Sequence, residues 1–292
     1  MEKQINYEIH PKEGLYFSIK VIVSLFLYAL MCYLLYVGYN SPNSKSIIVV
    51  ILYGVIIGLV LLFRMGILVG YLKGNAIKLS KEQFSDIYDI ASNQSRVLGL
   101  ENTPDIYILQ AGGLLNAFAT RFLGRNYIVL YSDILEEAYE NNKHSVEFII
   151  GHELGHIKRN HITKQLLLFP SIIIPFLNSA YSRACEYTCD RIGASLSPEG
   201  ARTGLVLLAS GKRLYHKVNI EKFIEQKETE DGFWSWFAEK ISTHPKLTKR
   251  VAEFQRTEFI SSVTYKKQII SETKTISKPV KTTEEHNRYM PQ

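Results

Sequence analysis

"FIIGHELGHIKRNH", residues 148–161, is the stretch from which the fold follows. It places three histidines, one glutamate and two glycines inside an otherwise helical pattern. Glycine lowers helix stability by roughly 1 kcal/mol relative to alanine, so the two glycines need a structural reason. Gly151 and Gly155 lie four apart on one ridge of the predicted helix, where the missing side chains would let a strand or a substrate come close.

His152 and His156 are expected to point the same way from this helix, because residues four apart are offset by only ~40°. Two neutral imidazoles one turn apart suit zinc. Glu153 beside them is placed to take a proton from a water that zinc has made more acidic. A five-residue match of this kind arises by chance in on the order of 1% of chains of this length, so its helical context strengthens the interpretation.

Zinc needs a third protein ligand, and His161 is not expected to be that ligand. It follows His152 by nine residues, about 180° round a continuous helix. One class of zincins uses a third histidine ten residues after the first and a glycine seven residues after it, but Ile162 and Arg159 occupy those positions here. We therefore interpret His161 as a surface or structural histidine at the end of the helix.

A better third ligand lies in "SRACEYTCDRIGA", residues 182–194. Glu186 and Asp190 are four apart, on one face of a second predicted helix. The first carboxylate can bind zinc, and the second can accept the far N–H of a ligand histidine and fix its tautomer. A salt-bridged helix face would show the same pattern. The need for a third ligand in a second helix favours the metal site.

Two apolar stretches, about residues 16–38 and 47–68, precede this region. Each is near the roughly 20 residues that cross a bilayer as a helix, and the short polar link "YNSPNSKS" predicts a membrane hairpin. A cleaved signal peptide is disfavoured, because the polar lead-in is long and acidic and no small-residue cleavage site follows. A buried core hairpin is the other alternative.

The charge distribution fits a protein at a membrane better than one that binds nucleic acid. Lys and Arg exceed Asp and Glu by only 34 to 28, a net charge of +6, and no basic run could follow a phosphate backbone. Basic residues lie at the outer ends of both spans, and the link has only Lys45, so the positive-inside bias places everything after residue 72 in the cytoplasm. Three cysteines, an odd count, favour a reducing compartment.

The rest of the chain is expected to be mainly helical with a small sheet, whose strands are predicted at 105–110, 114–122 and 126–132. The run 165–177 is apolar but too short to span, so it is either a core segment or a piece that dips into the membrane interface. The remaining segments are expected to be a core-packed aromatic helix (233–237, with an interface belt or substrate wall as alternatives), a mobile loop (225–232) and a flexible polar tail (261–292).

Three motifs in this order, "GHELGH" (151–156), "SRACEYTCD" (182–190) and "STHPKLTKR" (242–250), resemble the M48 family of zinc metallopeptidases, which includes HtpX-type, Ste24-type and Oma1-type membrane proteases. The resemblance covers roughly residues 75–257. It implies an α+β, mainly α, zincin-type domain at 73–260, after an N-terminal arm and transmembrane hairpin at 1–72. It also implies one Zn²⁺ per chain, with the following residues at the site: His152, His156 and Glu186 as ligands, Glu153 as general base, and Asp190 behind the ligands.

The same resemblance implies a substrate-binding cleft. His244, followed by Pro245, and Arg250 would donate to the oxyanion that forms when water attacks the scissile carbonyl, although His244 could equally begin a helix before a proline. "NAFAT", residues 116–120, would be an edge strand. There Asn116, Ala117 and Phe118 would pair with an extended substrate backbone.

The predicted function is that of a multi-pass cell-membrane zinc endopeptidase, whose partners are a polypeptide substrate and the lipid bilayer, with membrane-protein quality control as one role. Departures from the family pattern leave the substrate open: Arg121 stands where relatives often have glycine, and Cys189 where a small residue is usual. The alternatives are a non-proteolytic, metal-containing membrane adaptor or sensor and a dedicated CAAX-type processing protease. No oligomeric state is predicted.

Overall fold

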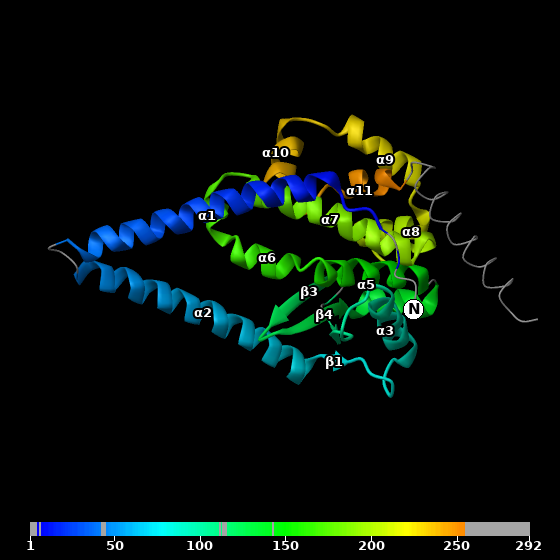
Figure 1. The fold of residues 1–292 in the computed structure, drawn as a ribbon. Helices are drawn as coiled ribbons and strands as arrows, with labels where there is room; N and C mark the ends of the chain where they lie inside the picture. Colours follow the sequence, from blue (N-terminus) through cyan, green and yellow to red (C-terminus); the bar gives the residue numbers. More distant parts are fainter. Residues whose placement is uncertain are drawn as a thin grey trace, which may run out of the picture. The chain divides into compact units, whose positions relative to one another are not determined.

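The computed structural model describes residues 5, 7–41, 45–110, 112, 116–141 and 143–254. These residues form a mainly helical fold with one small sheet behind two apolar N-terminal helices, which confirms the predicted fold class (Figure 1). Residues 1–255 cluster as one compact unit that contains every element named below. The predicted tail at 261–292 lies outside the described residues.

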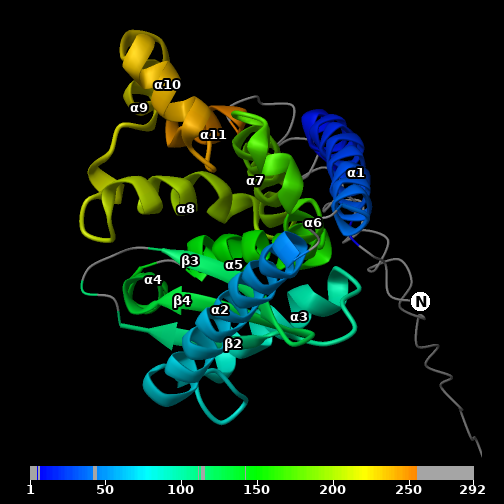
Figure 2. The same cartoon turned by 90° about the vertical axis from the view of Figure 1, so that its left-hand side faces the viewer.

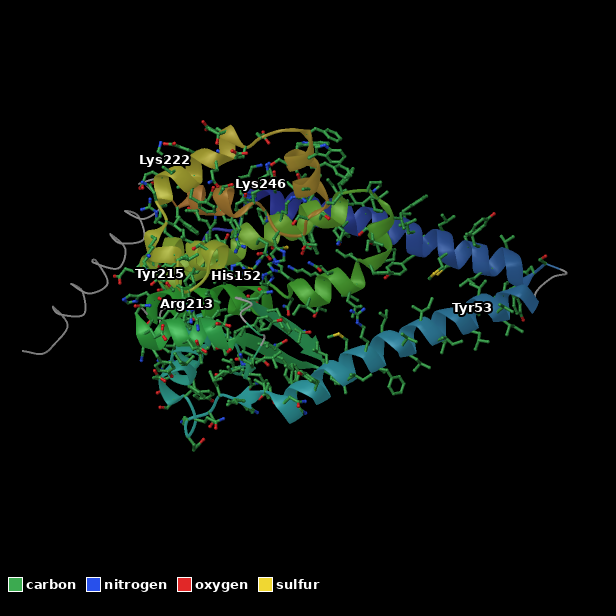
Figure 3. The ribbon with its side chains drawn as sticks, turned by 180° about the vertical axis from the view of Figure 1, so that it is seen from behind. Tyr53, His152, Arg213, Tyr215, Lys222 and Lys246 are labelled. Carbon is green, nitrogen blue, oxygen red and sulfur yellow. The ribbon has the colours of Figure 1, made fainter. Side chains whose placement is uncertain are left out.

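The two N-terminal helices, α1 (Pro11–Tyr39) and α2 (Lys45–Asn75), are long and apolar enough to cross a membrane. Their most apolar windows have mean hydropathies of 2.2 and 2.8, and only 6% and 0% of these windows are buried. Figures 1 and 3 show the end of α1 close to the start of α2, and the two helices diverging from there toward the rest of the unit. Because their apolar side chains are exposed, the alternative of a buried core hairpin is wrong.

The first turns of α1 are an exception to this exposure, because they pack on α7 (Leu177–Leu196). Lys20 Nζ donates to Asn178 Oδ1 at 2.6 Å, and the backbone N–H of His10 donates to Thr188 Oγ1 at 3.0 Å. The start of α1 is therefore docked on α7, whereas its C-terminal part extends away from α7 with its apolar side chains exposed.

The sheet has four strands in the order β1-β2-β4-β3. β2 pairs with β4 in parallel, and the other pairs are antiparallel. Val69 and Leu72 at the end of α2 pack on one face of this sheet, against Tyr107, Tyr127 and Val129. Among the described residues β3 pairs only with β4, so it is an edge strand. The strand bounds are β1 (Ile77–Lys78), β2 (Asp105–Leu109), β3 (Ala117–Phe122) and β4 (Arg125–Tyr131).

Helices pack against the other face of the sheet, and α5 lies between the sheet and α7 (Figures 1 and 2). The bounds of the remaining helices are α3 (Ser85–Val97), α4 (Ser132–Glu140), α5 (Lys143–Lys158), α6 (His161–Leu167), the 3₁₀ turn η1 (Phe169–Ile173), α8 (Pro198–Ser210), η2 (Tyr215–Lys217), α9 (Ile220–Thr229), α10 (Phe233–Ile241) and α11 (Leu247–Glu253).

Two surface segments differ from their predicted structure, and for a third the structure excludes one of two alternatives. The segment 225–232, predicted as a mobile loop, contributes its first five residues to α9. The aromatic cluster 233–237 forms α10, which has no buried residue, so the prediction of core packing is wrong. Within 165–177 most of the large apolar side chains are exposed, which excludes the core-segment alternative. An aromatic helix can pack in a protein core or face a lipid surface. The same apolar sequence pattern fits both environments, so it does not distinguish them.

Candidate metal centre

Helices α5 and α7 pack closely because the glycine ridge of α5 faces α7. A Cβ atom on Gly151 would lie 3.1 Å from the Cα of Gly193, and one on Gly155 would lie 3.2 Å from the Cα of Cys189. Both distances are tighter than ordinary contact, so larger residues would push the helices apart. The partner of this ridge is therefore a helix, and not the strand or substrate that the sequence suggested.

This close packing brings the three predicted ligands together. The donor atoms of His152, His156 and Glu186 all lie within 4.8 Å of one another. The Nε2 atoms of the two histidines are 3.3 Å apart. Glu186 places Oε2 at 3.4 Å from His152 Nε2 and Oε1 at 3.3 Å from His156 Nε2. Figure 3 marks His152 beside α7, in the interior of the unit.

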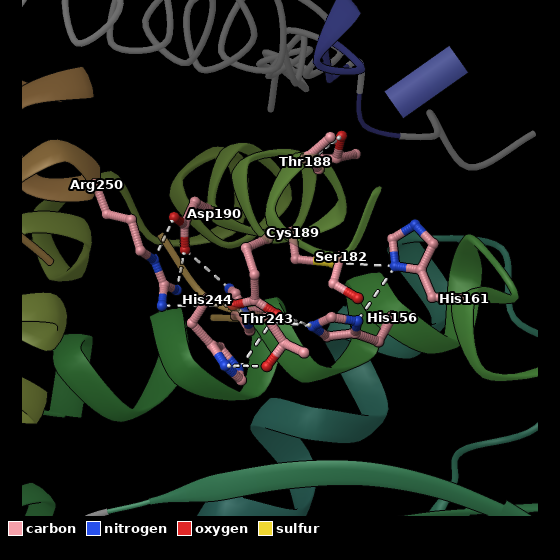
Figure 4. A network of polar contacts seen from close by, with 12 residues as sticks. His156, His161, Ser182, Thr188, Cys189, Asp190, Thr243, His244 and Arg250 are labelled. Carbon is pink, nitrogen blue, oxygen red and sulfur yellow. Dashed lines mark hydrogen bonds and ion pairs between the residues drawn. The ribbon is translucent and has the colours of Figure 1, made fainter. Parts of the chain in front are cut away.

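Asp190 fixes the tautomer of His152. Its Oδ1 lies 2.9 Å from His152 Nδ1, and a carboxylate can only accept, so Nδ1 carries a hydrogen and Nε2 is the nitrogen left to bind a metal ion. Arg250 in α11 holds the same carboxylate by two charge-assisted bonds, from Nε at 2.7 Å and Nη2 at 2.6 Å (Figure 4).

The residues present fit a divalent cation. Burial opposes ionisation, yet the neighbouring carboxylates of Asp190 and Glu186 raise the pKa of His152 to about 10. The field that holds a proton there would hold a metal ion equally well. Glu186 Oε2 is buried and has no hydrogen-bond partner among the described residues. Two imidazole nitrogens and one carboxylate match the ligand set of a catalytic zinc, which keeps a fourth position open.

Glu153 and His244 both lie near this centre but differ in their exposure to solvent. The Glu153 carboxylate is largely buried and forms no hydrogen bond or ion pair with any described residue, so it is available as a base. His244 is exposed, and its Nε2 lies 3.6 Å from Glu186 Oε1. The third predicted catalytic residue is placed differently. Arg250 is buried, two of its nitrogens bind Asp190, and Nη1 lies 3.4 Å from Glu186 Oε2.

His161 is not on the far side of the helix, because the helix does not continue to it. Helix α5 ends at Lys158, and Asn160, at a φ of 55°, turns the chain so that His161 begins α6. Asparagine is one of the few residues that adopt this conformation readily. The buried His161 ring then places Nδ1 3.2 Å from His156 Nδ1 (Figure 4). Burial lowers the pKa of His161 to about 4, against the opposing effect of Glu13, so the ring is neutral at pH 7.

The sequence did not predict a role for two further residues near His161, namely Glu13 and Arg159. Glu13 in α1 is buried, and its Oε1 lies 3.3 Å from His161 Nε2. Arg159 donates to the same oxygen from Nε at 3.1 Å and Nη2 at 2.9 Å. The one indication in the sequence is that Glu13 is the only acidic residue between positions 11 and 39.

The predicted substrate strand lies beside the metal helix. Ala117 and Phe118 begin β3, and Asn116 directly precedes it and caps it, with Oδ1 accepting from the Ala117 N–H at 2.9 Å. Strand β3 contacts α5, and Arg121 ties it to α6 through Thr163 Oγ1 at 3.0 Å. Arg121, which stands where relatives often have glycine, thus has a structural partner.

Comparison with known proteins identifies relatives of this chain. The family model for peptidase family M48 matches residues 81–174 and 166–258. The chain is similar to the protease HtpX homolog of Helicobacter acinonychis (strain Sheeba), 25% identical over 192 residues that cover 52% of this chain and 60% of the relative. The corresponding protein of Helicobacter pylori (strain Shi470) is 24% identical with the same coverage, so the chain spans about 60% of the length of these relatives.

A crystal structure of Ste24p from S. mikatae is similar over 84% of this chain and 67% of that one, at 14% identity and a TM-score of 0.46.

Proposed function

The chain belongs to peptidase family M48, and on this premise we propose that it is a membrane-anchored, zinc-dependent endopeptidase that cleaves protein substrates. The observation that carries the proposal is the convergence of His152, His156 and Glu186 within 4.8 Å, next to the Glu153 carboxylate, which has no partner among the described residues. A site that holds metal only for structure has no need of such a base, so this carboxylate favours the peptidase over the adaptor or sensor.

The chain's own groups divide the chemistry among them. A zinc ion held by the three ligands would supply Lewis-acid polarisation of the scissile carbonyl and would lower the pKa of nearby water. Glu153 then accepts the proton of the attacking water and delivers it to the leaving amine. His244, exposed at the mouth, donates to the developing oxyanion, whereas Arg250 acts through Asp190 by holding that carboxylate against His152.

An extended polypeptide is the substrate that this site accommodates best. Strand β3 is an edge strand beside α5, so the free side of its backbone can pair with a substrate strand. Asn116, Ala117 and Phe118 lie at its start and would fix the register of the bound peptide.

The bilayer is the second partner. In this proposal residues 1–72 anchor the catalytic residues 73–260 in the cell membrane, and the basic outer ends of the spans favour the cytoplasmic side for the catalytic residues. An exposed apolar face beside α1 rests on the same bilayer. It is joined to the span, since Tyr28 Oη donates to the Leu167 carbonyl at 2.9 Å. The face comprises Leu166, Leu167, Phe169, Ile172, Ile173 and Phe176 of the segment 165–177 and Phe233, Trp234 and Trp236 of α10.

The test compares the purified full chain with Glu153→Gln and with a matched control, Glu140→Gln, which changes an exposed glutamate of α4. We expect all three proteins to bind one zinc per chain, and only the wild type and the control to cleave an unfolded protein such as casein. A wild type that binds zinc but cleaves no polypeptide would support the adaptor. A wild type that spares casein and cleaves only a prenylated CAAX peptide would support the processing protease.

A further inference from the structure

We propose that Glu13, acting through His161, is a positioning residue for the zinc ligand His156, so that the N-terminal helix completes the metal centre. This inference rests on the proposed function. It follows from a line of ring and carboxyl atoms that runs from α1 through α6 to α5. The links are Glu13 Oε1 to His161 Nε2 at 3.3 Å, and His161 Nδ1 to His156 Nδ1 at 3.2 Å.

The direction of each hydrogen bond in this line is fixed by chemistry. The ionised carboxylate of Glu13 can only accept, so His161 carries its hydrogen on Nε2 and leaves a lone pair on Nδ1. That lone pair accepts the hydrogen on His156 Nδ1. His156 Nε2 is then unprotonated and faces His152 Nε2 at 3.3 Å, where the ion would lie. The reverse assignment would point the His161 Nε2 lone pair at a carboxylate and put a hydrogen on His156 Nε2, which excludes metal binding.

The arrangement parallels the support of the other histidine ligand. Asp190 fixes His152 directly and is itself held by Arg250. Glu13 fixes His156 through one intervening ring and is itself held by Arg159. Partners of this kind orient a ligand ring and raise its basicity, and their loss typically costs roughly 10–100-fold in metal affinity.

The same residues could instead form a second metal site, because Glu13, His161 and Cys185 also place ligand atoms within 4.8 Å of one another. The charge balance argues against it. The guanidinium of Arg159, 2.9 Å from Glu13 Oε1, already compensates the charge of this carboxylate. A positioning role therefore predicts one zinc per chain, whereas a second site predicts two.

The test measures the zinc dissociation constant by chelator competition on the full chain in detergent. His161→Leu removes the acceptor, and His161→Asn restores it, because an amide oxygen reaches the position of Nδ1. We expect the zinc dissociation constant to rise roughly 10–100-fold for His161→Leu and to stay near the wild-type value for His161→Asn. The visible spectrum of the cobalt-substituted protein should change in His161→Leu and be recovered in His161→Asn, which a purely structural role would not produce.

Glu13→Gln is a second, independent variant, and it tests the proposal even if His161→Leu does not fold. It should weaken zinc binding by about tenfold, while Glu8→Gln, a matched change at an exposed glutamate three residues before the start of α1, should leave it unchanged. Wild-type affinity in both His161→Leu and Glu13→Gln would overturn the positioning role alone. Two zinc ions per chain would also overturn it. A wild type that binds no zinc would overturn the proposed function as well.

Discussion

Asp190 Oδ1 lies 2.9 Å from His152 Nδ1 and 2.6 Å from Arg250 Nη2, so one buried carboxylate joins a predicted zinc ligand to the last described helix. Replacing it by Asp190→Asn removes the charge that holds the imidazole in the tautomer needed for metal binding. We expect the zinc affinity to fall by about 10–100-fold while the helical content is retained. Chelator competition and circular dichroism check this expectation, and unchanged affinity would contradict it.

Breaking the other half of this pair should affect folding more than metal binding. Arg250→Leu removes the guanidinium that pairs with the buried Asp190 carboxylate, and the loss of one partner of a buried pair costs about 3–5 kcal/mol. Arg191→Leu is the matched control. It breaks the ion pair of Arg191 Nη2 with Glu253 Oε1 at 2.7 Å, which is partly exposed to water and should cost roughly 1 kcal/mol. Denaturant unfolding of the zinc-free proteins measures both, and equal losses would show that the Asp190 pair is not special.

The zinc-free protein should lose stability as the pH rises above neutral. Against the effect of burial, Asp190 and Glu186 raise the pKa of His152 to about 10 from 6.5. A group with a raised pKa contributes its full stability below about pH 6.5 and loses it as the pH rises through about 10. The melting temperature of chelator-treated protein should therefore fall steadily from pH 6.5 to 9.

Zinc binding should show the opposite pH dependence. The ion displaces the proton on His152, so the apparent zinc affinity should increase about tenfold per pH unit over the same window. Chelator competition at four pH values measures the slope. A slope near zero would mean that His152 is already deprotonated in the zinc-free protein.

Helical spacing pairs His152 with His156 and Glu186 with Asp190 within single helices. The choice of Glu186 as the third predicted ligand also needed the coordination requirement of zinc and the family resemblance. The structure brings these four together without any further assumption. The predicted strands and most of the helices follow from the same local patterns, which depend on burial at period 2 or 3.6.

His161 and Glu13 could not be predicted in this way. The position of His161 depends on a single backbone torsion at Asn160, and no periodicity specifies where α5 ends. Glu13 reaches the site only because α1 docks on α7, a contact between segments some 170 residues apart in the sequence. Local patterns carry no information on such contacts, and the same limit explains why α10 was expected in the core.

The close approach of α5 and α7 makes Gly155 sensitive to a single methyl group. Gly155→Ala would place a Cβ 3.2 Å from both Cα and Sγ of Cys189, and overpacking of this kind typically costs about 1–3 kcal/mol. Gly74→Ala is the matched control, because a Cβ there meets nothing within 4 Å in a helix and should be neutral or slightly stabilising. Melting temperatures of the zinc-free proteins compare the two. We expect only Gly155→Ala to weaken zinc binding, since it also separates Glu186 from the histidines.

The exposed apolar face predicts that α10 touches lipid. Both tryptophans of the chain, Trp234 and Trp236, lie in this helix and are 77% and 47% exposed. Phe237 packs against Phe176, which directly precedes α7. Brominated lipids quench tryptophan on contact, so native fluorescence should drop when the protein is reconstituted in brominated vesicles instead of ordinary ones. For the control, both tryptophans are changed to phenylalanine and Glu221→Trp places a reporter on the exposed face of α9. Because α9 carries no exposed apolar cluster, its fluorescence should be the same in both lipids, and equal quenching at the two sites would contradict membrane contact through α10.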